Sequence, residues 1–153
     1  MRRVGQAAER EGIPCIVTPE DIDVSGAKLA CVKRIIPVVP PSANRLLRMH
    51  YRKRMRELDA WKTLIFYSVN GESRTAVYEW AAGRNRLKVE IHIEHAQLFD
   101  KDNLYSAAKL PLDALVRLGF LADDSNEFID LTVTQSRSKA KQTTISIYAP
   151  EKV

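Results

Sequence analysis

The sequence predicts a single α/β domain of the α+β kind, in which helices cover mainly one face of a small mixed β-sheet. The chain has 153 residues, enough to bury a core without disulfides or metals. Hydrophobic residues make up 45% and charged residues 28%, as in ordinary globular domains. Apolar residues alternate in some segments and recur at helical spacing in others. The resulting order is β-α-α-β-α-β-β, which fits one partly covered sheet.

The first half of the chain gives an arm, one strand and two helices. Residues 1–29 have no sustained period and contain five glycines and prolines, which favours an N-terminal extension or loosely packed arm before a domain at 30–153. Residues 30–39 read as a strand that ends at a Pro-Pro pair, and the loop PPSANR (40–45) follows. Helical spacing then predicts a helix over 54–69, and composition predicts a second over 75–82, ended by Gly83.

The second half gives three strands and one helix. Residues 86–95 alternate between apolar and polar, which predicts a half-buried strand. Residues 103–118 are helical in composition, although Pro111 could kink the helix or restart it near Leu110. Residues 128–134 and 143–149 alternate again, and a basic turn joins them in an apparent hairpin. On the predicted strand 86–95, His92 and His95 are expected on opposite faces, which is unsuited to joint metal binding.

Cysteine usage and hydropathy favour a cytoplasmic protein. Cys15 and Cys31 are the only cysteines, and reduced thiols are the simplest interpretation. No apolar run approaches the length of a membrane span. The N-terminal segment has basic residues but no apolar region like that of a secretory signal, so we expect none.

The net charge of +5 favours a polyanionic partner, and its distribution favours nucleic acid. Residues 45–56 hold His50 and six cations without an acidic residue: Arg45, Arg48, Arg52, Lys53, Arg54 and Arg56. A second group, Arg137, Lys139 and Lys141, falls in the predicted turn. The alternative is that both groups are merely solvated surface.

Carboxylates at both ends of the predicted helix 103–118 suggest a metal site. Asp100 and Asp102 precede it, Lys109 lies within it, and Asp123 and Asp124 follow it. Mg²⁺ prefers carboxylate oxygens and leaves room for a substrate phosphate, and a nearby lysine can stabilise developing charge. Local structure offers alternatives, because Asp102 could be a helix N-cap and the Asp-Asp-Ser-Asn segment is common turn chemistry. Asp113, inside the helix, is expected to serve the surface or a local hydrogen bond.

These motifs, taken in order, resemble the RusA family of Holliday junction resolvases. The matching pieces are PPSANR, then D-x-D-N-L, a lysine, D-A-L and G-x-x-x-D-D-S, and the resemblance covers residues 34–149. It implies a small homodimeric α/β domain and a Mg²⁺-dependent endonuclease, with Mn²⁺ as a substitute. Such enzymes cut four-way DNA junctions by paired nicks, and many are encoded by phages or prophages.

The resemblance implies roles for individual residues. Asp100 and Asp102 would be the D-x-D metal ligands, and Asp124 the third essential aspartate, with Asp123 beside it. Lys109 matches the catalytic lysine, displaced by an apparent three-residue insertion. Asn44 would shape the loop near the site. Phosphate contacts are expected from residues 45–56 and from Lys101, Arg137 and Lys139, because Gln97-Leu98-Phe99 replaces an arginine-rich run.

Two symmetric cuts on a four-way junction call for two identical sites related by a twofold axis, hence a homodimer. Two alternatives to junction resolution remain open at this stage. One is a non-catalytic DNA-binding relative with the same fold. The other is a nuclease that acts on flaps, forks or RNA.

Overall fold

The five strands of the described chain form one mixed sheet. The computed structural model describes residues 22–24 and 28–150. Its strands are β1 (Ile22–Val24), β2 (Lys28–Ile36), β3 (Leu87–His95), β4 (Ile129–Arg137) and β5 (Gln142–Tyr148). Their spatial order is β1-β2-β5-β3-β4. β3 and β4 are parallel, and the other neighbouring pairs are antiparallel.

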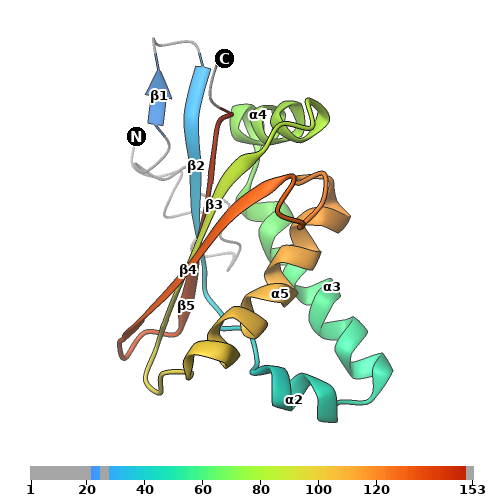
Figure 1. Cartoon of the computed structure of the whole chain (residues 1–153), viewed down its shortest axis with the longest axis vertical. Coiled ribbons are helices and arrows are strands. Elements are labelled where there is room, and N and C mark those ends of the chain that lie inside the picture. The colour runs from blue at the N-terminus through green and yellow to red at the C-terminus, as the bar shows by residue number, and fades with distance from the viewer. Residues whose placement is uncertain (1–21, 25–27, 151–153) are drawn as a thin grey trace.

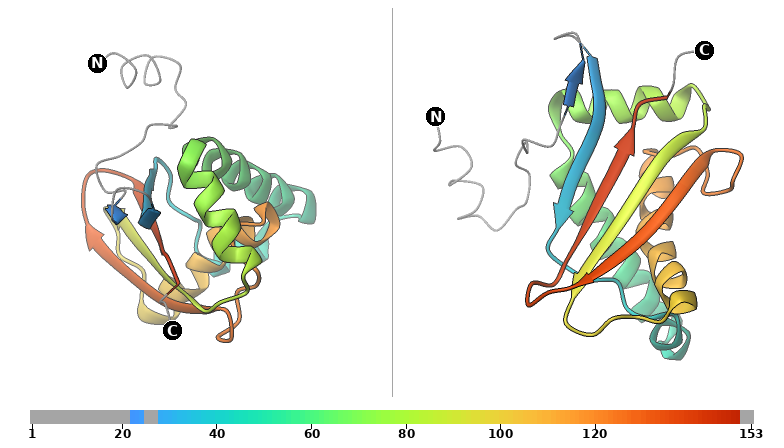
Figure 2. Two further views of the ribbon diagram at one scale, coloured as in Figure 1. Left: turned by 90° about the horizontal axis from the view of Figure 1, so that it is seen from above. Right: turned by 60° about the vertical axis from the view of Figure 1, so that its left-hand side comes forward.

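The helices of the described chain gather on one face of this sheet, as Figures 1 and 2 show. They are α2 (Ala43–Arg48), α3 (Tyr51–Ser68), α4 (Gly71–Ala82) and α5 (Lys101–Leu118). The predicted mixed sheet with helices mainly on one face is therefore confirmed. Of the predicted arm, residues 1–21 and 25–27 lie outside the described residues, whereas Ile22–Val24 pairs with β2.

The predicted loop after the first strand is partly helical. The PPSANR segment enters α2 at Ala43, and the Ser42 side chain caps the helix by accepting the N–H of Arg45 at 3.2 Å. α3 then begins three residues earlier than its apolar spacing predicts, because His50 Nδ1 accepts the N–H of Arg52 at 3.2 Å. Short caps of this kind leave little trace in hydrophobic periodicity.

The predicted hairpin between the last two strands is wrong. β3 lies between β4 and β5, so these consecutive strands are not hydrogen-bonded neighbours. α5 returns the chain to the start of β3, so β4 forms on one side of β3 in parallel, and β5 occupies the other side. An alternating strand can pair with any complementary edge, so local sequence does not decide this order.

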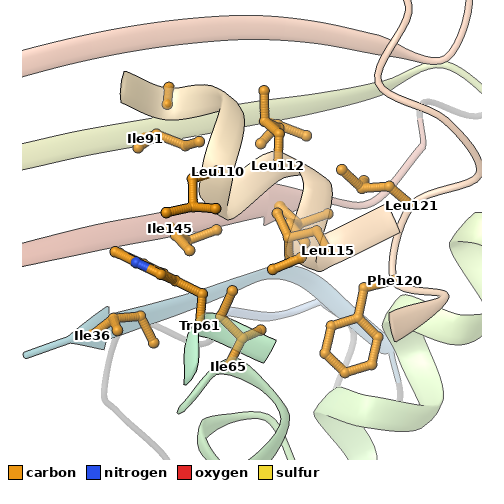
Figure 3. Packing of buried hydrophobic residues seen from close by; sticks show 14 of the residues in the cluster. Ile36, Trp61, Ile65, Ile91, Leu110, Leu112, Leu115, Phe120, Leu121 and Ile145 are labelled. Carbon is orange, nitrogen blue, oxygen red and sulfur yellow. The ribbon is translucent and has the colours of Figure 1, made fainter. Parts of the chain in front are cut away.

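α5 packs into the core along its whole length. Leu110, Leu112 and Leu115 lie over the sheet residues Ile91 and Ile145, and the α3 residues Trp61 and Ile65 complete the layer (Figure 3). Pro111 is itself buried, and the helix runs unbroken past it. The predicted kink or restart is therefore not needed. Burial of each large apolar side chain contributes about 1.5–3 kcal/mol, which offsets the backbone hydrogen bond that proline removes.

Candidate functional site

The first turn of α5 presents the Asp-x-Asp pair at the surface. Asp100 is the N-cap, and its Oδ1 accepts the N–H of Asn103 at 2.9 Å. Lys101 and Asp102 follow in the first turn, and all three side chains are exposed. The predicted capping residue was Asp102, and the structure assigns this role to Asp100. A carboxylate here also interacts favourably with the helix dipole.

The side chain of Gln135 on β4 holds the loop that leads into this turn. Its Oε1 accepts the N–H of Phe99 at 3.0 Å, and its Nε2 donates to the Phe99 carbonyl at 2.8 Å. His95 Nε2 lies 3.1 Å from the same Oε1, and the His95 ring packs on the Phe99 ring. Because Phe99 immediately precedes Asp100, this clamp fixes where α5 begins. Sequence pattern alone did not single out Gln135, because the pairing of β3 with β4 is what brings its side chain beside His95.

A second acidic pair forms toward the other end of α5. Partial desolvation raises the pKa of Asp113, the charge of Asp124 raises it further, and Arg117 and Lys109 oppose both effects. Lys109, Asp113 and Arg117 are four residues apart in turn, so they share one face of the helix. Asp123 and Asp124 are half-buried in the loop that follows. The i, i+4 spacing to two cations was the signal that could have singled out Asp113.

One copy of the chain does not gather the predicted carboxylates into one cluster. Asp102 and Asp113 are about 16 Å apart along the helix axis, at a rise of about 1.5 Å per residue. Within residues 22–24 and 28–150, no group of three or more His, Cys, Asp or Glu side chains is placed to hold a metal ion. Mg²⁺ usually takes one or two protein carboxylates plus waters and phosphates. The Asp100–Asp102 pair meets that requirement, so these aspartates as metal ligands stay a prediction.

The larger basic group lies beside the start of α5. α2 packs against α5, and the cations of residues 45–56 are all exposed. None of these cations forms an ion pair with a described residue. The ion pairs found among the described residues join Lys62 to Asp59 and Lys88 to Glu90. Asn44 is exposed in the first turn of α2. We name residues 43–56 the basic corner.

The smaller basic group reaches the same end of the molecule. Arg137 Nη1 donates to the Ala96 carbonyl at 3.3 Å, and the Ser138 N–H donates to the His95 carbonyl at 3.0 Å. The connection between β4 and β5 is thereby tied to the loop before Asp100, and Figures 1 and 2 show both at the end where α2 lies. Lys139 and Lys141 are exposed there.

His92 and His95 lie on opposite faces of the sheet. His92 lies on the sheet face away from the helices, where its ring nitrogens meet Thr134 Oγ1 at 2.7 Å and Ser136 Oγ at 2.9 Å. His95 lies on the opposite face in the Gln135 clamp, which confirms the predicted placement of the two residues on opposite faces. Cys31 is buried and Cys15 lies outside the described residues, so the predicted thiol state stays a prediction.

Comparison with known proteins does not support the predicted family. No protein family matches the sequence, and no curated protein is similar to it. The resemblance to RusA resolvases, which rested on short motifs in order, is therefore corrected, and the chain is not assigned to that family. Among solved structures, a thiamine monophosphate kinase from Aquifex aeolicus is a distant match, with 10% identity and a TM-score of 0.40. The alignment covers 97% of this chain but only 41% of the kinase.

No helix in residues 22–24 and 28–150 has the length and apolar content that crossing a bilayer requires.

Proposed function

We propose that this protein binds DNA at the end of the molecule where α5 begins, and cleaves it as a Mg²⁺-dependent endonuclease. The observation that carries the proposal is the gathering of exposed cations around exposed carboxylates. α2, in the basic corner, packs against α5, and Arg137 ties the β4–β5 connection to the loop before Asp100. Exposed cations without ion-pair partners bind backbone phosphates and release counterions. Asp100 already caps α5, and metal binding would give the two exposed aspartates a second role beside those cations.

The chemistry that we propose uses the residues of α5 and the loop after it. Asp100 and Asp102 would hold Mg²⁺, with Mn²⁺ as a substitute. The bound metal would polarise the phosphoryl oxygen and favour hydroxide as the attacking group. Lys109 would stabilise charge on the phosphate or the leaving oxygen. Asp124, with Asp123 beside it, does not join this pair in one copy of the chain. It would be the third carboxylate on which cleavage depends, supplied by a second copy.

The proposed substrate is branched DNA, with the four-way junction as the first to test. Paired cuts at a junction would need two copies of the chain related by a twofold axis. Homodimerisation is therefore part of this proposal.

A second candidate function is DNA binding without cleavage. It is favoured by the absence of a three-donor metal group in the described residues. The basic surface is common to both functions, so only the chemical step distinguishes them.

The deciding experiment incubates the full chain with labelled four-way junction, fork, flap and linear duplex, in Mg²⁺ and in EDTA. Cleavage of branched DNA in Mg²⁺ alone is the expected result. Binding without cleavage of any substrate would favour the second candidate. Failure to bind any of these DNAs would overturn both.

A further inference from the structure

The basic corner exposes two large apolar side chains. Leu47 is 74% exposed and Tyr51 is 63% exposed, the two highest values among the large hydrophobic residues of the described chain. Single exposed apolar side chains are normal on protein surfaces. These two are four residues apart, on either side of the joint between α2 and α3.

The fold holds these side chains outward. α2 has no buried residue, but Leu46 packs against the core and anchors it. Met49 and His50 have extended backbone, with ψ near 143° and 147°, so the chain turns sharply between the two helices. Met55 anchors the start of α3 in the same way as Leu46 anchors α2. Leu47 and Tyr51 are thus exposed on a segment that Leu46 and Met55 hold against the core.

The charge around the corner specifies the kind of partner. Arg45, Arg48 and Arg52 are exposed and interleave with Leu47 and Tyr51 in sequence, and residues 43–56 contain no Asp or Glu. Proteins that bind unpaired bases combine cations for the phosphates with aromatic rings on which bases stack. Apolar side chains such as leucine also wedge between base pairs and unstack them.

We propose that Leu47 and Tyr51 form a base-stacking wedge that selects DNA with unpaired or easily unstacked bases over intact duplex. This inference rests on the proposed DNA-binding function and names its substrate class. Tyr51 would stack on an exposed base at a branch point, Leu47 would block re-pairing, and the arginines would hold the flanking phosphates. A basic surface with exposed Leu and Tyr is also found in proteins that bind anionic membranes, so the test includes vesicles.

The test measures binding of the full chain in EDTA to a blunt duplex and to a forked duplex of matched sequence, with 2-aminopurine at the fork. We expect Tyr51→Ala and Leu47→Ala each to weaken fork binding about tenfold, the scale of one lost base stack, and to change blunt-duplex binding less than about twofold. Tyr51→Phe keeps the ring and should bind like the wild type. The wild type, and not Tyr51→Ala, should quench 2-aminopurine.

Tyr67→Ala is the matched control, because Tyr67 is 51% exposed near the opposite end of α3. Its fork binding should not change. Equal weakening of fork and duplex by Tyr51→Ala, or no weakening at all, would overturn the wedge while leaving DNA binding intact. A wild-type chain that binds phosphatidylserine vesicles but neither DNA would overturn both the wedge and the proposed function.

Discussion

The two ends of α5 carry similar residues in different surroundings. At its start, Asp100 and Asp102 are exposed, the preceding loop is clamped by Gln135, and unpaired cations lie near. Toward its end, partial desolvation and the charge of Asp124 raise the pKa of Asp113, and the cations that oppose this shift, Arg117 and Lys109, lie on the same helix face as Asp113. The first arrangement leaves charge available to a partner, whereas the second largely balances its charge within the protein. Whether an acidic pair is available to a partner must therefore be judged from the charged groups around it, and not from the pair alone.

The largest effect expected is on cleavage. Asp102→Asn and Asp124→Asn should each slow single-turnover cleavage of branched DNA by about 100-fold or more, because each removes a carboxylate of the proposed site. Their effects on binding should differ: Asp102→Asn should tighten binding modestly by removing negative charge beside the DNA, and Asp124→Asn should leave it unchanged. Cleavage within about threefold of the wild type would exclude that aspartate from the chemistry.

Lys109→Ala tests whether the cation between the two ends acts in the chemical step. We expect a loss of about two orders of magnitude in single-turnover rate, the scale of one charge-stabilising donor, with little change in DNA affinity. Lys109→Arg should restore the rate only in part, because a planar guanidinium does not replace a compact ammonium. A wild-type rate in Lys109→Ala would leave the role to another cation such as Lys101.

Removal of the clamp should weaken the start of α5. Gln135→Leu leaves the half-buried N–H and carbonyl of Phe99 without their partner, so we expect a loss of about 2 kcal/mol in the free energy of unfolding. Urea denaturation measures it, and cleavage should fall because Asp100 and Asp102 lose their fixed position. Gln142→Leu is the control: the Gln142 side chain donates one hydrogen bond, to Glu94 on the open face, and its loss should cost less. Equal losses in the two variants would mean that the Gln135 clamp contributes no more to stability than the single side-chain hydrogen bond of Gln142.

Neutralisation of Arg52, Lys53 and Arg54 to alanine tests the basic corner. Binding to all DNA shapes should weaken together, and the slope of log affinity against log salt should fall by about 0.9 for each lost duplex phosphate contact. The control changes Arg84, Arg86 and Lys88, which are exposed around the start of β3, to alanine and removes the same charge. An unchanged slope in the first variant, or the same change in both, would show that the corner is ordinary solvated surface.

The smallest effect expected concerns Asp113. The pKa of Asp113 is raised in the folded protein, so its ionised carboxylate destabilises the fold. The full penalty applies at neutral pH. It disappears at acidic pH, where the group is protonated in both the folded and the unfolded protein. Asp113→Asn should therefore raise Tm by on the order of 1 °C at pH 7, with the gain vanishing as pH falls below about 4. Asp130→Asn, on the exposed side of β4, is the control. A gain that grows on acidification would contradict this explanation.

Much of the fold could be predicted from the sequence, because helices and half-buried strands carry their own periodicity. The alternation of β3, with Leu87, Val89, Ile91 and Ile93 all buried, follows directly from the sequence. The exposed cations of residues 45–56 were equally predictable, since this segment itself contains no carboxylate. The order of motifs, in contrast, suggested a family that comparison did not support, because short polar motifs recur in unrelated proteins.

Only the tertiary structure determines which residues distant in sequence become neighbours. Local sequence does not reveal that β3 separates β4 from β5, because strand partners are chosen by edges that form only when the chain has folded. The same pairing brings Gln135 to Phe99 and Arg137 to Ala96, over 36 and 41 residues. α5 also runs unbroken through the buried Pro111, so the acidic residues at its start and those toward its end lie apart. The sequence determined which residues can do chemistry here, and the long-range packing determined which of them can do it together.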